Sequence, residues 1–201
     1  NPDGSVDPTF DPSPDSSISA LALQPAGRLL VGGNFSVLAG QSRKSLGRLL
    51  ASGAIDSSFD IGTGADAAVN VIKLQSDGRV LVGGNFRQFN GAPVQCLVRL
   101  TTTGAADPAF SLGATQLAVV NDLALQGDGK IFVAGEWLYA GNRNYWGAFR
   151  LDASGAFDSS FAPELKEGAS SVVVTADGRV VLGGRFASVG GTPRSGAARF
   201  Q

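Results

Sequence analysis

The chain has 201 residues, with 16 Lys and Arg against 17 Asp and Glu, a net charge of −1, no histidine and one cysteine. This balance excludes a broad electrostatic attraction to nucleic acid or to an anionic membrane, and no run of about 18 apolar residues is present to span a bilayer. The lack of histidine and of paired cysteines removes Ser-His-Asp catalysis, a disulfide framework and a cysteine zinc cluster. We therefore expect no nucleic-acid partner, no membrane insertion, no metal and no cofactor.

The N-terminal segment, Asn1 to Phe10, carries a Gly-x-x-Asp-x-x-Phe motif that returns three times, as Gly53 to Phe59, Gly104 to Phe110 and Gly155 to Phe161. The chain thus begins in the middle of a repeat. These motifs predict one domain, 1–201, of four repeats with boundaries near Phe10, Phe59, Phe110 and Phe161. Because no methionine occurs, we expect the sequence to be part of a longer protein.

After a proline-rich connector, Ile18 to Leu23 alternates apolar and small residues, which predicts a β-strand. The residues that follow, Pro25-Ala26-Gly27, predict a hairpin turn, and Arg28 to Val31 predicts the returning strand. A Gly32-Gly33-Asn34-Phe35 bend ends this strand. The stretch recurs near Asp77 to Phe86, Asp128 to Trp137 and Asp177 to Phe186.

Each repeat continues through a glycine loop to a third strand with an arginine, Arg48 in the first unit, thirteen residues after the aromatic. Between the Gly-Arg/Lys turns the repeats measure 51, 51 and 49 residues, which suits three or four short strands. Such units cannot bury a face alone, so they must stack, either radially as a propeller or linearly as a solenoid. Solenoids usually have shorter repeats, so we predict an all-β propeller of four blades.

The two chain ends nearly match in repeat phase, since joining Gln201 to Asn1 would place Gly4 six residues after Arg199, against five inside the chain. We expect the N-terminal strand to pair with the last blade, which would close the ring and remove exposed sheet edges. Two alternatives stay open. In the first, the sequence is a segment of a longer array of repeats, cut at equivalent points of two repeats. In the second, it forms a larger ring with a second copy.

These units resemble the delta-60 repeats of bacterial and archaeal exported proteins, which are classed among β-propeller repeats. The resemblance rests on Asp-Gly-Arg, the hydrophobic run, Gly-Gly-x-Phe, Arg-Leu and Gly-x-x-Asp-x-x-Phe, and it covers essentially the whole chain. It implies a propeller at the cell surface or secreted, without a catalytic residue set, so our predicted location is extracellular, cell surface or periplasm. The third unit departs from the pattern at Ala134 and Trp137, and the first at Ala26.

The repeated arginines could form a ring of cations for an anionic ligand. We favour a structural role instead, in which each arginine pairs with the aspartate of its own or a neighbouring unit and fixes strand register. Three aspartates lie eight residues after an arginine, and Asp7 would complete the set. The residues are Arg48, Arg99, Arg150 and Arg199, with Asp7, Asp56, Asp107 and Asp158.

Other repeated residues suggest chemistry that the pattern does not favour. The turn acids Asp77, Asp128 and Asp177 invite a calcium hypothesis, but each loop offers one carboxylate where calcium prefers several. The Gly-Gly loops lack the following helix that phosphate binding needs, so close strand approach or positive φ explains them better. Cys96 occupies a slot that is Ser45, Gly147 or Gly196 elsewhere, and we expect it to be unreactive.

One window breaks the repetition, because both tryptophans and both tyrosines of the chain fall in it. We expect Trp137 to replace the core phenylalanine of the other units. For the rest we predict a binding surface, since aromatic faces beside amides and charges stack on sugars or anchor proteins. The predicted binding residues are Tyr139, Asn142, Arg143, Asn144, Tyr145 and Trp146.

The sequence favours a non-catalytic β-propeller scaffold or protein-interaction module, as part of a surface assembly or adhesin that associates with itself or with a larger complex. The alternative is a carbohydrate-binding module that uses the aromatic window of the third repeat. The expected partner is thus a protein or a glycan. An enzyme is disfavoured, because no pair of acids stands out as a catalytic dyad.

Overall fold

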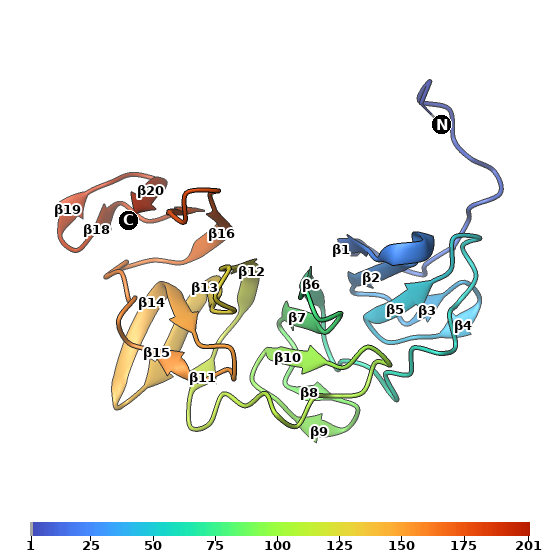
Figure 1. The fold of residues 1–201 in the computed structure, drawn as a ribbon, viewed down its shortest axis with the longest axis horizontal. Helices are drawn as coiled ribbons and strands as arrows, with labels where there is room; N and C mark the ends of the chain where they lie inside the picture. The colour runs from blue at the N-terminus through green and yellow to red at the C-terminus, as the bar shows by residue number, and fades with distance from the viewer. Residues whose placement is uncertain (1) are drawn as a thin grey trace.

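A computed structural model describes residues 2–201, so Asn1 at the start of the predicted first motif lies outside the described part. The fold is all-β, as predicted, and the described residues form four antiparallel sheets, one for each repeat, with three separate two-stranded hairpins. The innermost strands of successive sheets contact one another, so the sheets are arranged side by side as the blades of a propeller. The blades follow the chain order around an open arc (Figure 1).

Blade 1 contains strands β1 (Ile18–Leu23), β2 (Leu29–Gly33) and β5 (Leu46–Leu49), paired in that order. A short 3₁₀ turn, η1 (Pro25–Gly27), joins β1 to β2. A two-stranded hairpin of β3 (Val37–Leu38) and β4 (Gln41–Ser42) lies between β2 and β5. The expected fourth strand is reduced to one bridge, Leu49 with Ile55.

Blade 2 repeats this arrangement. Its sheet contains β6 (Val69–Leu74), β7 (Val80–Gly84) and β10 (Leu97–Leu100), and its hairpin contains β8 (Gln88–Phe89) and β9 (Ala92–Pro93). Blade 4 has the same plan, with β16 (Ala169–Val174), β17 (Val180–Gly184) and β20 (Ala197–Phe200), and with the hairpin β18 (Ser188–Val189) and β19 (Thr192–Pro193).

Blade 3 is built differently. Its strands are β11 (Gln116–Leu117), β12 (Val120–Leu125), β13 (Ile131–Ala140), β14 (Arg143–Leu151) and β15 (Phe157–Asp158). In the other blades the second strand stops at the Gly-Gly bend, whereas β13 and β14 continue as one hairpin of ten and nine residues. Strand β11 adds to the edge of this extension by pairing with β13. The unit that departs in sequence therefore also departs in structure.

The hydrophobic cores lie between the blades. Val80 and Val82 of β7 point toward blade 1, while Leu81 points toward blade 3, as the alternation of a strand requires. The same division recurs between blades 3 and 4. Blades 2 and 3 thus bury both faces of their sheets against their two neighbours, which explains why their strands are largely apolar.

The second glycine of each bend allows two strands to approach closely. A β-carbon on Gly84 would lie 2.1 Å from the carbonyl oxygen of Ala68, and one on Gly33 would lie 2.1 Å from that of Ser17. Neither glycine has a positive φ. Of the two explanations that the sequence left open, close approach applies here.

The expected closure of the ring is not formed. Residues 2–17 contain no strand, and within residues 2–201 no segment pairs with β20 except β17. Figure 1 shows the N-terminal and C-terminal segments on opposite limbs of the arc, separated by its opening. Residues 2–9 are exposed and the N-terminal segment extends away from blade 1 (Figure 1), whereas Phe10 packs on that blade with its ring close to Gly53.

Candidate functional site

Two groups of residues stand out from the packing: a network repeated in the blades and the hairpin of blade 3. The network begins with an arginine on the third long strand of the sheet, β5, β10 or β14. Arg48 Nε lies 2.9 Å from Asp56 Oδ2, Arg99 Nε lies 2.8 Å from Asp107 Oδ2, and the Arg150–Asp158 distance is 2.9 Å. We call each such pair an arginine clip. Three of the four expected pairs are formed, and Arg199 and Asp7 lie apart.

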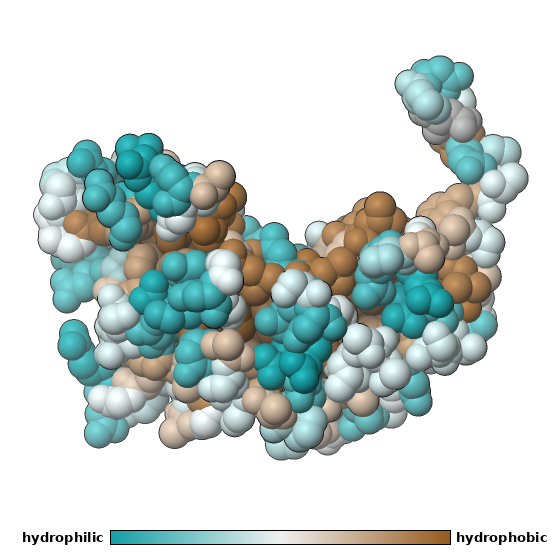
Figure 2. All heavy atoms as spheres, viewed as in Figure 1, coloured by the Kyte–Doolittle hydropathy of each residue, from teal (hydrophilic) through white to brown (hydrophobic). Residues whose placement is uncertain are grey.

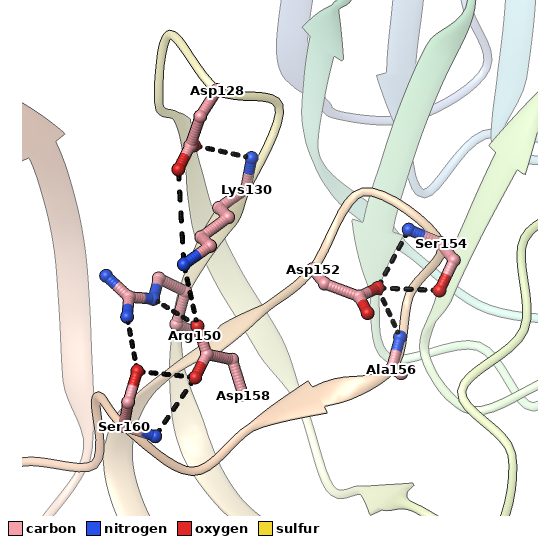
Figure 3. Close-up of polar contacts among 8 residues, drawn as sticks. All are labelled: Asp128, Lys130, Arg150, Asp152, Ser154, Ala156, Asp158 and Ser160. Carbon is pink, nitrogen blue, oxygen red and sulfur yellow. Dashed lines mark hydrogen bonds and ion pairs between the residues drawn. The ribbon is translucent and has the colours of Figure 1, made fainter.

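A second cation, which the sequence analysis missed, joins each clip. Arg28, Arg79 and Lys130, the basic residues at the hairpin turn, lie 3.2 to 3.3 Å from the aspartates of their own blades. The signal was present, because a basic residue follows the turn glycine in every repeat. Figure 3 shows this arrangement in blade 3, where Lys130 and Arg150 both contact Asp158.

The arginines of the clips also contact a phenylalanine of the same repeat and a carbonyl group of the following blade. The guanidinium of Arg48 lies 4.6 Å from the ring centre of Phe59, and Arg99 lies 4.9 Å from that of Phe110. Arg48 also donates to the carbonyl oxygen of Thr102 in blade 2, and Arg99 donates to that of Ala153 in blade 3. Each of these arginines therefore ties its own blade to the following one.

The aspartates are held in the ionised state. The Ser58 hydroxyl, the Ser58 amide and Arg48 lower the pKa of Asp56, against the opposing effect of burial. For Asp107 the amide of Ala109 is the main cause of the lowered pKa, and for Asp158 the Ser160 hydroxyl is the main cause. Both oxygens of each carboxylate contact donors of their own blade, so the geometry of the clips is that of a structural network.

The hairpin of blade 3 presents a different surface. Its cross-strand pairs are Trp137 with Trp146, Leu138 with Tyr145, Tyr139 with Asn144 and Ala140 with Arg143. Alternation along the strands places Trp137, Tyr139, Asn144 and Trp146 on one face, which we call the aromatic face. Tyr139 is 37% exposed and Trp146 is 44% exposed.

The other predicted binding residues lie around this face or behind it. Asn142 occupies the turn, with a φ of 62°, and accepts a hydrogen bond from the Tyr139 hydroxyl. Tyr145 faces the core, where its ring centre lies 4.7 Å from that of Phe157. The guanidinium of Arg143 lies over the ring of Tyr145. The structure thus brings Tyr139, Asn144 and Trp146 together on one surface, and uses Tyr145 to anchor the hairpin.

Trp137 does not fill the core position that its place in the repeat predicts. Phe35, Phe86 and Phe186 are 2%, 0% and 1% exposed, whereas Trp137 is only partly buried. The pairing of β13 with β14 shifts in register between Ala134 and Trp137, and this irregularity turns the tryptophan outward. Leu138, the next residue, is fully buried in the core instead.

A surface pocket of about 440 Å³ adjoins the aromatic face. Trp146 forms one wall, and the other lining residues are Glu136, Lys166, Glu167, Gly168 and Arg185. Three of these residues lie far from the hairpin in sequence: Lys166 and Glu167 belong to the connection to blade 4, and Arg185 belongs to blade 4 itself. Their presence in the pocket could therefore not be predicted from the sequence around Trp146. The pocket combines one apolar wall with two acids and two bases.

The other candidate sites that the sequence suggests have no reactive or metal-binding geometry in the described residues. Cys96 is fully buried, its Sγ lies 3.0 Å from the carbonyl oxygen of Ala118, and burial raises the pKa of its thiol. Within residues 2–201, no three His, Cys, Asp or Glu side chains are grouped so that they could hold a metal ion. No helix in the same residues is long and apolar enough to cross a membrane.

The four blades, the inter-blade cores and the repeated clips define a β-propeller repeat protein. The chain belongs to the family described as domain of unknown function (DUF5122) beta-propeller, whose model matches residues 24–59, 75–110, 126–161 and 175–201. These segments begin near the hairpin turn, and the first three end at Phe59, Phe110 and Phe161. No curated protein matches the chain.

Solved structures align with the chain at low sequence identity. A streptogramin B lyase structure aligns with a TM-score of 0.50 at 13% identity, over 96% of this chain and 57% of that chain. A protein of unknown function from Bacteroides caccae aligns with 0.42 at 16%, over 68% and 46%. The PQQ-bound aldose sugar dehydrogenase from Streptomyces coelicolor aligns with 0.48 at 17%, over 96% and 69%. The chain spans about half the length of the first two.

Proposed function

We propose that this chain is a non-catalytic interaction module of an exported protein, in which the stacked blades present the aromatic face of blade 3 to a protein partner. The observation that carries this proposal is the extended hairpin, because the family repeat is interrupted there by two solvent-facing aromatic side chains, Tyr139 and Trp146. Tyrosine and tryptophan provide large contact areas at low entropic cost, and they dominate binding energy at protein interfaces.

The hairpin is also anchored by packing and strand pairing, which should reduce the entropic cost of binding. Leu138 is fully buried beneath it, Tyr145 packs on Phe157, and β11 supports its edge. A preorganised surface loses less conformational freedom when a partner binds. The buried carboxylates of the module are engaged by the clips, which supports a scaffold role for the rest of the blade.

A second candidate function is glycan binding, and the pocket beside Trp146 favours it. A sugar ring can stack on an exposed indole while neighbouring acids and bases hydrogen-bond to its hydroxyl groups. Glu136 and Glu167 would accept from such hydroxyls, and Lys166 and Arg185 would donate to them. This candidate needs the pocket, whereas the protein-interaction proposal needs the aromatic face.

Three variants separate the two candidates. Trp146→Ala removes a residue common to both surfaces, Tyr139→Ala affects the aromatic face alone, and Glu167→Gln affects the pocket alone. We would measure retention of each variant on a glycan array, on purified cell walls and on protease-treated or untreated cell-envelope extracts. Loss with Tyr139→Ala and with protease, but not with Glu167→Gln, is the result expected for a protein partner.

The reverse pattern, with loss for Glu167→Gln on glycans and no effect of Tyr139→Ala, would assign the glycan function. Leu50→Ala provides a matched control, since Leu50 is an exposed apolar side chain in blade 1. If Trp146→Ala and Tyr139→Ala were both retained as well as the wild type on every support, the hairpin would not be a binding surface. Both candidate functions would then be excluded.

A further inference from the structure

The extended hairpin of blade 3 has one paired edge and one unpaired edge. On the outer side of β13, strand β11 pairs with Leu138 and Tyr139. On the outer side of β14, strand β15 pairs with Arg150 and Leu151, at the far end of the strand from the hairpin turn. Within residues 2–201, no strand other than β13 pairs with β14 between residues 143 and 146.

The turn of the hairpin determines which main-chain groups point away from β13. Gly141 and Asn142 both have positive φ values, 55° and 62°, as a two-residue hairpin loop requires. In such a loop the flanking residues, Ala140 and Arg143, form a hydrogen-bonded pair. Hydrogen-bonded and non-hydrogen-bonded pairs alternate along an antiparallel ladder, so Asn144 directs its N–H and C=O groups away from β13.

Trp146 has the same orientation as Asn144, because it lies two residues further along β14. Its partner across the hairpin is Trp137, whose carbonyl oxygen accepts from the Ala118 amide on the outer side of β13. This bond confirms that the two tryptophans form a non-hydrogen-bonded pair. In the described part of the chain, Asn144 and Trp146 form no main-chain hydrogen bond outside the hairpin.

This edge is exposed, unlike the corresponding edges of blades 1 and 2. The third strands of those blades begin at Leu46 and Leu97, which are 0% and 3% exposed. Strand β14 begins earlier in the repeat, at Arg143, and the added part of its edge is exposed at Asn144 and Trp146. Proteins usually block an exposed edge with proline, a bulge or a covering segment. None of these occurs along this part of β14, all of which the structure describes.

The connection to blade 4 marks the end of the open edge. A β-carbon on Gly147 would lie 2.6 Å from the carbonyl oxygen of Glu167, so the connection crosses β14 directly after Trp146. The pocket that Trp146 and Glu167 line lies at this crossing. Before it, the edge offers the N–H and C=O groups of Asn144 and Trp146, two residues apart.

We propose that the protein partner binds by adding an extended segment to this edge of β14, as a further strand of blade 3. This inference rests on the proposed interaction function and specifies how the partner binds. The N–H and C=O groups of every second residue match the repeat of an extended polypeptide, and a sugar chain has no such repeat. Figure 2 shows white and teal surface over the outer side of the arc, toward which the hairpin extends (Figure 1), and brown surface mainly along the inner side. Main-chain hydrogen bonds therefore supply affinity that apolar burial alone does not.

The two faces of the hairpin determine which side chains this segment needs. Its residues opposite Asn144 and Trp146 lie beside the aromatic face, where aromatic and β-branched side chains form the best cross-strand pairs. Its other residues lie on the side of Arg143, whose guanidinium lies over the ring of Tyr145. In the described part of the chain Arg143 forms no ion pair, so an acidic side chain fits beside it. The expected segment alternates aromatic or β-branched residues with acidic ones.

Amide hydrogen exchange of the chain alone tests whether this edge is free. The amides of Arg143 and Tyr145 belong to hydrogen-bonded pairs with β13 and should be protected. Those of Asn144 and Trp146 point outward and should exchange at least about tenfold faster, as measured by NMR. Equal protection of the four amides would show that the edge is already occupied, and would overturn the proposal.

Two variants at one position separate the main chain from the side chain. Asn144→Pro removes the outward N–H and keeps the pairing with β13, because proline is accepted at edge positions whose N–H faces solvent. Asn144→Ala keeps the N–H and is the matched control. The probes are linear peptides of about ten residues, selected from a phage-displayed library on the wild-type chain. Asn144→Pro should weaken their binding at least about tenfold, and Asn144→Ala should change it less than about twofold. Peptides that bind Asn144→Pro as well as the wild type would overturn the proposal.

Peptide analogues give a second test on the wild-type chain, which holds even if Asn144→Pro does not fold. A selected peptide is methylated at one main-chain nitrogen at a time. Only alternate N–H groups of an added strand face β14, so binding should be lost at every second position and retained at the positions between. A pattern without this period of two would overturn the added strand.

Two further outcomes identify a different occupant or a different binding mode. A doubled mass in sedimentation that Asn144→Pro abolishes would show that a second copy of the chain occupies the edge, and would overturn the partner segment. Retention on cell-envelope extracts that is lost with Tyr139→Ala and kept with Asn144→Pro would support the interaction function and overturn the added strand.

Discussion

A β-carbon on Gly83 would lie 2.5 Å from Cγ1 of Val120, so the glycine of blade 2 leaves the space that the valine of blade 3 fills. Gly32 has the same relation to Val69 in the preceding junction. Between blades 3 and 4 both residues of this contact differ: Ala134 replaces the glycine and Ala169 replaces the valine. The departure of the third repeat at Ala134 is thus compensated in the fourth.

This compensation predicts a double-mutant effect. Gly83→Ala should destabilise the chain by about 1–3 kcal/mol through overpacking. Adding Val120→Ala should recover part of that loss, although Val120→Ala alone is destabilising because it leaves a cavity. Urea unfolding of the two single variants and the double variant measures the coupling. Strictly additive effects would contradict the packing relation.

The clips should be sensitive to loss of one partner. Arg48 and Asp56 are each 6% exposed, so Asp56→Asn leaves a buried guanidinium without its counter-charge. We expect a loss of about 3 kcal/mol in the free energy of unfolding. Asp77→Asn is the control, because the Asp77–Arg79 pair is about half exposed and an asparagine can keep the bond to the Arg79 amide. It should change stability by less than about 1 kcal/mol.

The same aspartates predict acid sensitivity. Hydrogen bonds and arginines lower the pKa values of Asp56, Asp107 and Asp158 below the ordinary value of 3.8. A carboxyl with a lowered pKa stabilises the fold above its unfolded-state pKa, and this contribution disappears as the pH falls through the folded-state pKa. Stability should therefore fall as the pH drops below 3.8. Urea midpoints between pH 6 and pH 2.5 should show this fall, with a shallower slope in Asp107→Asn.

The second glycine of the bend should tolerate no side chain. Gly84→Ala places a β-carbon 2.1 Å from the Ala68 carbonyl oxygen, so the strands must separate, at a cost of about 1–3 kcal/mol. Gly127→Ala is the control, because no atom lies within 4 Å of its added β-carbon. It should be neutral within about 0.5 kcal/mol. Equal melting temperatures for the two variants would show that the close approach is not required.

Cys96 should be protected from thiol reagents. Its side chain is fully buried, and burial raises the pKa of the thiol, so little reactive thiolate is present at neutral pH. Modification by iodoacetamide should be at least about tenfold slower in the native chain than in urea. Cys96→Gly should fold, because the residue has a φ of 60° and glycine holds the equivalent positions 147 and 196. Rapid native modification would contradict the buried position.

The repeat pattern predicted the blades well, because turn glycines and apolar strands are local signals. The strand expected at Ile18 to Leu23 coincides with β1, and the four-blade propeller is confirmed. The expected pairing of the N-terminal segment with the last blade is not found within residues 2–201. Near-continuity of repeat phase indicates which segments could pair, but it does not specify the curvature between blades, which depends on contacts between sheets.

The candidate site was only partly predictable. Aromatic composition pointed to blade 3, since its tryptophans and tyrosines differ from the other repeats. The outward position of Trp137 depends on a register shift between β13 and β14, which the residue pattern does not predict. Likewise, Lys166 and Arg185 reach the pocket of Trp146 only because blade 4 packs beside the hairpin. Contacts across blades require the folded arrangement.

The bonds from Arg48 to Thr102 and from Arg99 to Ala153 end on main-chain carbonyls. A carbonyl oxygen is supplied by any amino acid, so the receiving blade needs no particular side chain for this bond. A unit can therefore be duplicated, deleted or exchanged without a matching substitution at this contact in its new neighbour. This bond therefore places no constraint on the sequence of the neighbouring unit, whereas the packing of Gly83 against Val120 does, and an individual unit such as blade 3 can carry a surface of its own.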